Sequence, residues 1–358
     1  MSENAQEQPW LSTAFGLTIL GLGGCLSIYG AESFGENAVY YSLRQLVWLV
    51  IGIALYLWIS HISFDFWKRS AKWLAGIALA GLLLVLFGGI RINGMQGWFS
   101  IGPFLIQPSE FAKGPFLLML SLYAAQTELP EQKRFLRMAV TGILFCGCVL
   151  LEPDFGSATV FFLGLAAVLG LTLKLRYLLA LFCGVALPAA LVFIFRHGYA
   201  MRRFAGYWNP DEHFQGAGWH VKQFQFSMAH GGLFGSEWGG ALWSNAYLPL
   251  AHSDSAFAAI VESGGLAGGM LVIGGCLAVA WFFRRIALRT EDKAARTFIF
   301  ATGAMFTAQA LLHIGVNTAL LPPTGLTLPL FSYGGSSLLA TMFAFGLAAS
   351  AGRSSSKN

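Results

Sequence analysis

Long apolar runs separated by short polar segments dominate the chain. Ten of these runs are continuous enough to predict helices that cross a membrane, because a spanning helix needs roughly 20 mostly apolar residues. Apolar and polar positions do not alternate within the runs, which favours helices over a transmembrane barrel. We expect the spans at residues 12–31, 43–60, 73–90, 111–126, 137–152, 156–173, 177–195, 256–283, 297–316 and 335–351.

The composition agrees with this pattern. Of the 358 residues, 56% are hydrophobic and only 11% are charged, and the mean hydropathy is +0.63. A soluble globular chain is about a quarter charged, so the composition excludes a soluble fold. The first run has no basic residue before it and no cleavage signal after it, so we expect it to stay as a membrane helix. The sequence predicts an all-α polytopic membrane protein with a single domain over residues 1–358.

Basic residues gather on one side of the predicted topology. With Met1 inside, 15 of the 22 Lys and Arg residues fall on the inner side. They are Lys68, Arg69, Lys72, Lys133, Arg134, Arg137, Lys174, Arg176, Arg284, Arg285, Arg289, Lys293, Arg296, Arg353 and Lys357. The positive-inside rule then places both termini in the cytoplasm. The same rule places the long loop between the seventh and eighth spans, about residues 197–255, outside.

An acidic residue stands at the mouth of the eighth span. The long polar loop ends at Asp254, and an apolar run follows directly. A carboxylate at the membrane end of a helix is costly and usually has a function, so we place Asp254 at the centre of the chemistry. A simple helix cap is the alternative for Asp254, and His252 is a second candidate for the same chemical role.

Two adjacent arginines, Arg202 and Arg203, lie in the long loop. Guanidinium groups form forked hydrogen bonds that match phosphate oxygens, so both residues are candidates to bind a lipid diphosphate. Ordinary contact with lipid headgroups is the alternative for this pair.

Three charged residues stand at the outer ends of the fourth to sixth spans. Pro108 and Ser109 indicate a helix start, where Glu110 is favoured by the positive end of the helix dipole. Lys113 follows at the start of an apolar run, and Asp154 lies between spans five and six. A structural ion pair is the alternative for Lys113, and a helix cap is the alternative for Asp154. We expect these two residues to pair with each other at the outer end of a cavity.

Helix-breaking residues follow the ninth span. Three prolines and repeated Gly and Ser lie between residues 321 and 337. Irregular backbone at membrane depth is tolerated only when it is buried in protein or lines a cavity. We therefore expect a re-entrant or broken-helix segment that forms one wall of the site and contains Ser332 and Ser336.

Four motifs occur in a fixed order along the chain. They are Gln107-Pro108-Ser109-Glu110-Phe111-Ala112-Lys113, Pro153-Asp154-Phe155-Gly156, Tyr247-Leu248-Pro249 with Ala251-His252 and Asp254, and Pro329 with Ser332-Tyr333-Gly334-Gly335-Ser336-Ser337-Leu338. Together with the ten spans, the motifs resemble the SEDS family (shape, elongation, division and sporulation), which includes the RodA, FtsW and SpoVE proteins. The resemblance covers nearly the whole chain.

The resemblance implies a peptidoglycan glycosyltransferase that polymerises lipid II at the outer face of the bacterial plasma membrane. The implied reaction is inverting, with undecaprenyl diphosphate as the leaving group. A class B penicillin-binding protein that crosslinks the strands is the implied partner, with other membrane proteins of an elongation or division complex. The family's essential Asp falls on Asp254, its outer-loop Trp falls on Trp98, and its charged cluster falls on Glu110, Lys113 and Asp154.

The chain departs from the family pattern at several positions, including Leu250, Ser253 and Ser255, where the family has Glu, Thr and Phe. Gly97 stands where the family usually has Arg, and Glu152 stands where it has Gln. Ser244 replaces a Lys, and Ser263 replaces the second Glu of a pair. These departures indicate a divergent member that has lost cations for phosphate binding. The residues that could replace those cations are Arg196, Arg202, Arg203 and Lys222.

Two other functions fit a polytopic membrane protein. A flippase or solute transporter is expected to spread charges through the bilayer depth and to repeat broken helices in both halves, whereas here the acids gather on the outer side. A non-catalytic scaffold of a cell-wall synthase would tolerate the loss of Asp254. The sequence leaves open whether a divalent cation such as Mg²⁺ or Mn²⁺ lies beside the acids, and whether the protein serves elongation, division or sporulation.

Overall fold

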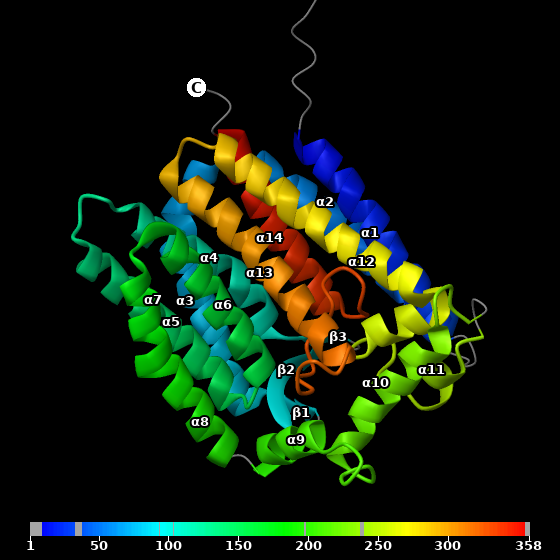
Figure 1. Ribbon diagram of the computed structural model, residues 1–358. Helices are drawn as coiled ribbons and strands as arrows, with labels where there is room; N and C mark the ends of the chain where they lie inside the picture. The colour runs from blue at the N-terminus through cyan, green and yellow to red at the C-terminus, as the bar shows by residue number, and fades with distance from the viewer. Residues whose placement is uncertain are drawn as a thin grey trace, which may run out of the picture.

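The structure, a computed structural model, describes residues 9–32, 38–92, 94–102, 104–196, 198–236 and 240–354, and it is a bundle of long helices (Figure 1). The long helices are α1 (Pro9–Ala31), α2 (Ala38–His61), α3 (Phe64–Gly88), α4 (Pro108–Ala125), α5 (Glu131–Leu151), α6 (Phe155–Thr172), α12 (Ala256–Arg289), α13 (Lys293–Asn317) and α14 (Gly335–Ser354). The all-helical membrane fold predicted from the sequence is confirmed.

Within the described residues, nine helical stretches are long and apolar enough to cross a membrane. They correspond to nine of the ten expected spans. The exception is α4, expected as the span 111–126, because its first turns carry Glu110 and Lys113 and make it too polar to qualify. Most of α4 is buried, and the helix packs against α3, α6, α13 and α14. This central position explains why α4 can carry charge within a membrane bundle.

Two spans differ in detail from the expectation. Helix α3 begins at Phe64 rather than at residue 73, with Asp65 in its first turn, where the helix dipole favours an acid. The seventh span consists of α7 (Leu175–Leu181), the π-helical turn η1 (Phe182–Ala186) and α8 (Leu187–Arg196). Pro188 lacks the N–H that would bond one turn back, and the wide turn before it accommodates that loss.

The segment between α3 and α4 contains a small antiparallel sheet that the sequence did not predict. Its described strands are β1 (Ile90–Ile92), β2 (Met95–Ile101) and β3 (Phe104–Ile106), in the order β1-β2-β3. Gly94 and Gly102 adopt positive φ in the turns, a conformation that suits glycine. The sheet lies at the end of the bundle opposite the first turn of α1 and the last turn of α14 (Figure 1).

The long loop expected at residues 197–255 is largely helical. It contains α9 (Gly198–Trp208), α10 (Ala217–Gly231) and α11 (Leu242–Ala246), which lie near the sheet-bearing end of the bundle (Figure 1). Helix α12, which follows, is interrupted at Gly265, where φ is 66° and ψ is −169°. The loop after α10 supplies the backbone bonds at this break, because Ser236 N–H donates to the Glu262 carbonyl at 2.8 Å and Gly232 O accepts from Leu266 N–H at 2.9 Å.

The segment between α13 and α14 is irregular and folds back into the bundle. Residues 318–334 contain no helix, and Leu328 and Leu330 in this segment are buried. The broken-helix segment expected from the prolines and glycines is confirmed. The part that includes Leu328 and Leu330 is enclosed by protein, as irregular backbone in a membrane bundle requires.

The described basic segments of the predicted inner side lie at the end of the bundle where α3 and α13 begin and α14 ends (Figure 1). An ion pair of 3.0 Å between Lys68 and Asp292 joins the first turn of α3 to the start of α13. The Lys174 ammonium lies 3.7 Å from the Glu131 carboxylate, which joins the residue before α7 to the start of α5. The helices thus place these segments at the end away from the sheet, as the predicted topology requires.

Candidate functional site

A cavity of about 1090 Å³ lies at the sheet-bearing end of the bundle. Its walls come from the sheet, the first three turns of α2, the first turns of α4 and α6, Phe204 of α9, the turn before α12, and residues 322–337. Six side chains predicted from the sequence to belong to the site line it: Trp98, Glu110, Asp154, His252, Asp254 and Ser336. The structure therefore brings together residues as far apart in the sequence as Trp98 and Ser336.

The main chain of the turn that carries Asp254 is held by three consecutive carbonyl groups. The His252 carbonyl accepts from Tyr333 N–H at 2.7 Å, and the Ser253 carbonyl accepts from the Ser332 hydroxyl at 2.6 Å. The Asp254 carbonyl accepts from the Asn317 side-chain amide at 3.1 Å. Ser332, predicted to belong to the cavity, is buried behind it and acts on the backbone instead.

Glycine lets the irregular segment pass close to the Asp254 carboxylate. Gly325 has a positive φ of 77°, and a Cβ at that position would lie 3.7 Å from Asp254 Oδ2. The Ser253 hydroxyl lies 3.3 Å from Asp254 Oδ1. The carboxylate thus stands at the junction of the long loop and the broken-helix segment, on the cavity wall.

The partner expected for Lys113 is wrong. Its ammonium bonds to Glu110 Oε1 at 2.6 Å and to Gln309 Oε1 at 2.8 Å, and no ion pair within 4 Å joins it to Asp154. Asp154 instead caps α6, since its Oδ1 accepts from Ser157 N–H at 2.8 Å. An acid three positions away on the same helix outcompetes one across the bundle, because i,i+3 neighbours share a face. The capping alternative for Asp154 is confirmed.

Glu152 and Gly97, two of the departures from the family pattern, lie against each other. Glu152 is fully buried, and neither of its carboxyl oxygens has a hydrogen-bond partner. A Cβ at Gly97 would lie 3.2 Å from Glu152 Oε2. Burial, and then the charge of Asp154, raise the pKa of Glu152 to about 9. Glu152 is therefore a neutral acid near pH 7, which the sequence alone did not indicate.

His252 belongs to a cluster of rings on the cavity wall. Its Nδ1 lies 2.5 Å from Glu32 Oε1 at the end of α1. Its ring stacks on Tyr41 with centroids 4.8 Å apart and meets Tyr333 edge-on at 5.4 Å. The Glu32 carboxylate at Nδ1 and the two rings fix the orientation of the His252 side chain on the cavity wall.

Arg44 is the cavity cation that the sequence analysis missed. It lies near the start of α2 and lines the cavity, with Nη1 donating to the Tyr40 hydroxyl at 3.0 Å and the guanidinium 5.7 Å from the Phe104 ring centre. Arg202, predicted for the diphosphate role, is exposed on α9 and does not line the cavity. The side chain of Arg203 lies outside the described residues. A basic residue at the apolar start of a span was the signal for Arg44.

Trp98 and Ser336 both line the cavity. Trp98 is half-buried in β2. The Ser336 hydroxyl donates to the Leu105 carbonyl at 2.7 Å and accepts from Gln107 N–H at 3.3 Å. Ser336 therefore ties the start of α14 to β3 and to the residue before α4.

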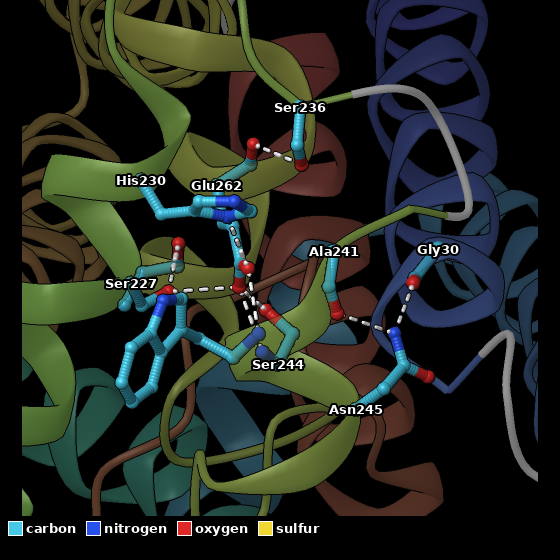
Figure 2. A network of polar contacts seen from close by, with 10 residues as sticks. Gly30, Ser227, His230, Ser236, Ala241, Ser244, Asn245 and Glu262 are labelled. Carbon is cyan, nitrogen blue, oxygen red and sulfur yellow. Dashed lines mark hydrogen bonds and ion pairs between the residues drawn. The ribbon is translucent and has the colours of Figure 1, made fainter.

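Another buried carboxylate, Glu262, joins the long loop to α12 (Figure 2). It is fully buried, and Ser227 and His230 of α10 contact it at 3.1 and 3.0 Å. The N–H groups of Trp243 and Ser244 donate to it at 2.8 and 2.7 Å, and the Ser244 hydroxyl donates at 2.5 Å. Ser244, one of the departures from the family pattern, thus has a structural role here.

The acids and histidines of the described residues do not converge on a metal centre. No group of three or more His, Cys, Asp or Glu side chains in that part of the chain is arranged to hold a metal ion. The cysteines among these residues form no disulfide, and Cys25, Cys148 and Cys276 are buried in the bundle.

Comparison with known families and proteins gives one consistent result. The model of the FtsW, RodA and SpoVE family, described as cell cycle protein, matches residues 10–357. The probable peptidoglycan glycosyltransferase FtsW of Trichlorobacter lovleyi is 32% identical over 348 residues, which cover 94% of this chain and 88% of that protein. The protein of the same name from Thioalkalivibrio sulfidiphilus is 34% identical over 349 residues, covering 92% of this chain and 86% of its own.

Solved structures show the same likeness. A chain from work on the structural coordination of polymerization and crosslinking by a peptidoglycan synthase complex superposes with a TM-score of 0.82 at 26% identity, covering 99% of this chain and 100% of that one. The crystal structure of the Thermus thermophilus rod shape determining protein RodA superposes with a TM-score of 0.74 at 27% identity, and each chain is covered completely.

Proposed function

The chain belongs to the FtsW, RodA and SpoVE family, and we propose that its cavity joins lipid-linked disaccharides into glycan strands with Asp254 as the base. The protein is a multi-pass membrane peptidoglycan glycosyltransferase of the FtsW and RodA kind. The observation that carries the proposal is the position of Asp254 on the wall of the cavity, in a turn whose main chain is held on three carbonyl groups.

The proposed reaction is a displacement at the anomeric carbon of the donor sugar. A hydroxyl of the acceptor sugar attacks that carbon, the new C–O bond forms, and the bond to the polyprenyl diphosphate breaks with inversion. The hydroxyl proton passes to the Asp254 carboxylate as attack proceeds, which is general base catalysis. The diphosphate leaves as an anion. A cation on the cavity wall can stabilise its negative charge, so no general acid is needed to protonate it.

The proposed cation for the diphosphate is Arg44, with His252 beside it. Both side chains line the cavity, and Tyr333 lies between them. The Tyr333 ring packs on His252, and its hydroxyl interacts with the Arg44 guanidinium. A guanidinium binds phosphate oxygens in a forked geometry. This replaces the role that the sequence suggested for Arg202.

The rest of the cavity is suited to the lipid and sugar parts of the substrate. Its wall includes Trp48, Trp98 and Phe104, and aromatic faces pack well on sugar rings and acyl-like chains. Trp98 is the proposed sugar-packing residue because it stands on β2, between the two turns of the sheet.

The proposed orientation places the sheet-bearing end outside the cell. The opposite end carries the Lys68–Asp292 pair and the basic segments, which the positive-inside rule assigns to the cytoplasm. The substrate is then taken from the outer leaflet. The similarity to a chain of a complex that polymerises and crosslinks supports a crosslinking partner, which we propose is a class B penicillin-binding protein.

The test is polymerisation of fluorescent lipid II by the purified protein in liposomes. Asp254→Asn should lower the rate by the ~10²–10⁴-fold typical of losing a general base, with an unchanged melting temperature. Asp211→Asn is the matched control, since Asp211 is an exposed acid of the same loop, and it should keep full activity. Polymer formed by Asp254→Asn at the wild-type rate would exclude the base role.

The same assay separates the other functions. A transporter would move labelled lipid across the bilayer without making polymer. A scaffold would make no polymer alone, and its support of a partner enzyme would survive Asp254→Asn.

A further inference from the structure

Two polar side chains near the end of α13 bind the first turn of α12, directly after Asp254. His313 Nε2 accepts from the N–H of Phe257 at 3.3 Å, and Asn317 Oδ1 accepts from the N–H of Ala258 at 3.0 Å. His313 and Asn317 are four residues apart, so they lie on one face of α13. The same Asn317 amide donates to the Asp254 carbonyl at 3.1 Å.

The hydrogen bonds of His313 assign its tautomer. Its Nε2 accepts from a backbone N–H and therefore carries no proton. Its Nδ1 lies 2.7 Å from the Leu326 carbonyl, which can only accept, so Nδ1 carries the proton. His313 is thus a neutral ring that joins three segments: α13, the start of α12 and the broken-helix segment.

Helix α12 does not cap itself in the usual way. Its N-cap residue, Ser255, makes no side-chain bond to the first turn, and its hydroxyl donates to the Pro249 carbonyl at 2.5 Å. The first N–H groups of a helix have no partner within the helix and need one from elsewhere. Here α13 supplies it, so the first turn of α12 is attached to α13 rather than to its own cap residue.

Burial makes this link stiff. His313 is 1% exposed and Asn317 is fully buried, so water cannot replace a lost bond. The link to α13 fixes the helix that directly follows Asp254. The bonds from Ser332 and Tyr333 of the broken-helix segment fix the main chain directly before it. The main chain of Asp254 can then move only if α12, α13 and that segment move together.

We propose that His313 and Asn317 are positioning residues for Asp254, which set where its carboxylate stands in the cavity by capping α12 from α13. The proposal rests on the proposed function, in which Asp254 is the base. Neither residue lines the cavity, so neither is expected to touch the substrate. A displacement of about 1 Å at a reacting group can cost about 10²-fold in rate.

Two variants at His313 separate its two hydrogen bonds. His313→Gln can keep an acceptor near the position of Nε2 and so keep the bond to Phe257. His313→Asn can keep a donor near the position of Nδ1 and so keep the bond to Leu326 while losing the cap. Both variants are neutral and polar, and each removes one bond of the pair.

The measurement is lipid II polymerisation in liposomes, with kcat and KM determined separately and the melting temperature recorded for each protein. His313→Asn should lower kcat about 10–100-fold with KM within about two-fold of wild type. His313→Gln should restore kcat to within about three-fold of wild type. Asn317→Ala should resemble His313→Asn. Thr302→Val on α13 is the control, because the Thr302 hydroxyl bonds only within its own helix, and it should match wild type.

The outcomes are distinguishable from failure of the proposed function. If wild type makes no polymer, or if Asp254→Asn is fully active, the base role itself fails. If Asp254→Asn is inactive while His313→Asn matches wild type in kcat, the positioning role fails alone. Equal losses of kcat in His313→Gln and His313→Asn, or a loss carried by KM, would also overturn it.

Discussion

Replacement of Glu262 by Ala is expected to detach the long loop from α12. The side chain is fully buried and receives five hydrogen bonds from described residues: two from backbone N–H groups, two from serine hydroxyls and one from His230. Together these bonds join α10 and α11 to α12 (Figure 2). The carboxylate therefore holds the loop that leads to Asp254.

The magnitude follows from the donors that Glu262→Ala leaves behind. The N–H groups of Trp243 and Ser244 lose their acceptor, and an unsatisfied buried donor costs about 1–3 kcal/mol. Ser227 retains its bond to the Ala258 carbonyl at 3.2 Å, and His230 is partly exposed and can bind water. Two backbone donors thus set the loss of unfolding free energy at about 2–6 kcal/mol. Glu262→Gln keeps one acceptor oxygen and should lose about half as much.

Two measurements test this estimate. Unfolding in mixed detergent micelles gives the change in free energy, and hydrogen exchange gives the protection of the amides in residues 217–246. Asp211→Asn is the control, because the Asp211 side chain is 84% exposed and a solvent-screened ion pair contributes about 0–1 kcal/mol. Glu262→Ala should lose protection across residues 217–246 while α5 and α6 stay protected. Stability within about 1 kcal/mol of wild type, with unchanged exchange in that range, would refute the reasoning.

Three further predictions concern charge. Glu152 has a pKa raised from 4.5 to about 9 in the fold, so the folded protein binds a proton that the unfolded chain has released. The contribution of Glu152 to stability should therefore be complete below pH 4.5 and be lost as the pH rises toward 9; Glu152→Gln should remove this part of the slope in thermal unfolding, and an unchanged slope would contradict the assignment. Arg44→Ala should raise KM for lipid II at least about ten-fold, as loss of a charge-assisted bond to phosphate implies, while Arg202→Ala should leave KM unchanged; the reverse ranking would restore the role suggested from the sequence. A cysteine at Gln215 should react with an impermeant thiol reagent on intact cells, and labelling near Glu291 in its place would invert the topology.

The helices and the broken-helix segment could be predicted because their signals are local. A continuous apolar run of about 20 residues has few alternatives to a membrane helix, and prolines with glycines break one. The sheet could not be predicted, since its strands β1 and β3 have three residues each. Such short strands carry no recognisable alternation and depend on the turns at Gly94 and Gly102.

Site residues could be named from the sequence, but their partners could not. Lys113 was expected to reach Asp154, yet Gln309, which is 196 positions away, receives its second hydrogen bond. Arg44 stands at the apolar start of a span, but only the fold shows that this position faces the cavity. Contacts across a bundle depend on how helices pack, which periodicity along one helix does not specify.

The buried acids around the cavity show how one fold gives carboxyl groups different tasks. Glu110 is neutralised by Lys113, and Asp154 caps a helix. Glu152 has no partner and is held in its neutral form by burial. Asp254 differs from all three. The hydrogen bonds that fix its turn are made to the main-chain carbonyls of residues 252–254 and to the first turn of α12. An acid that is oriented through its backbone can change protonation without releasing the structure that orients it, which is the property a recurring base requires.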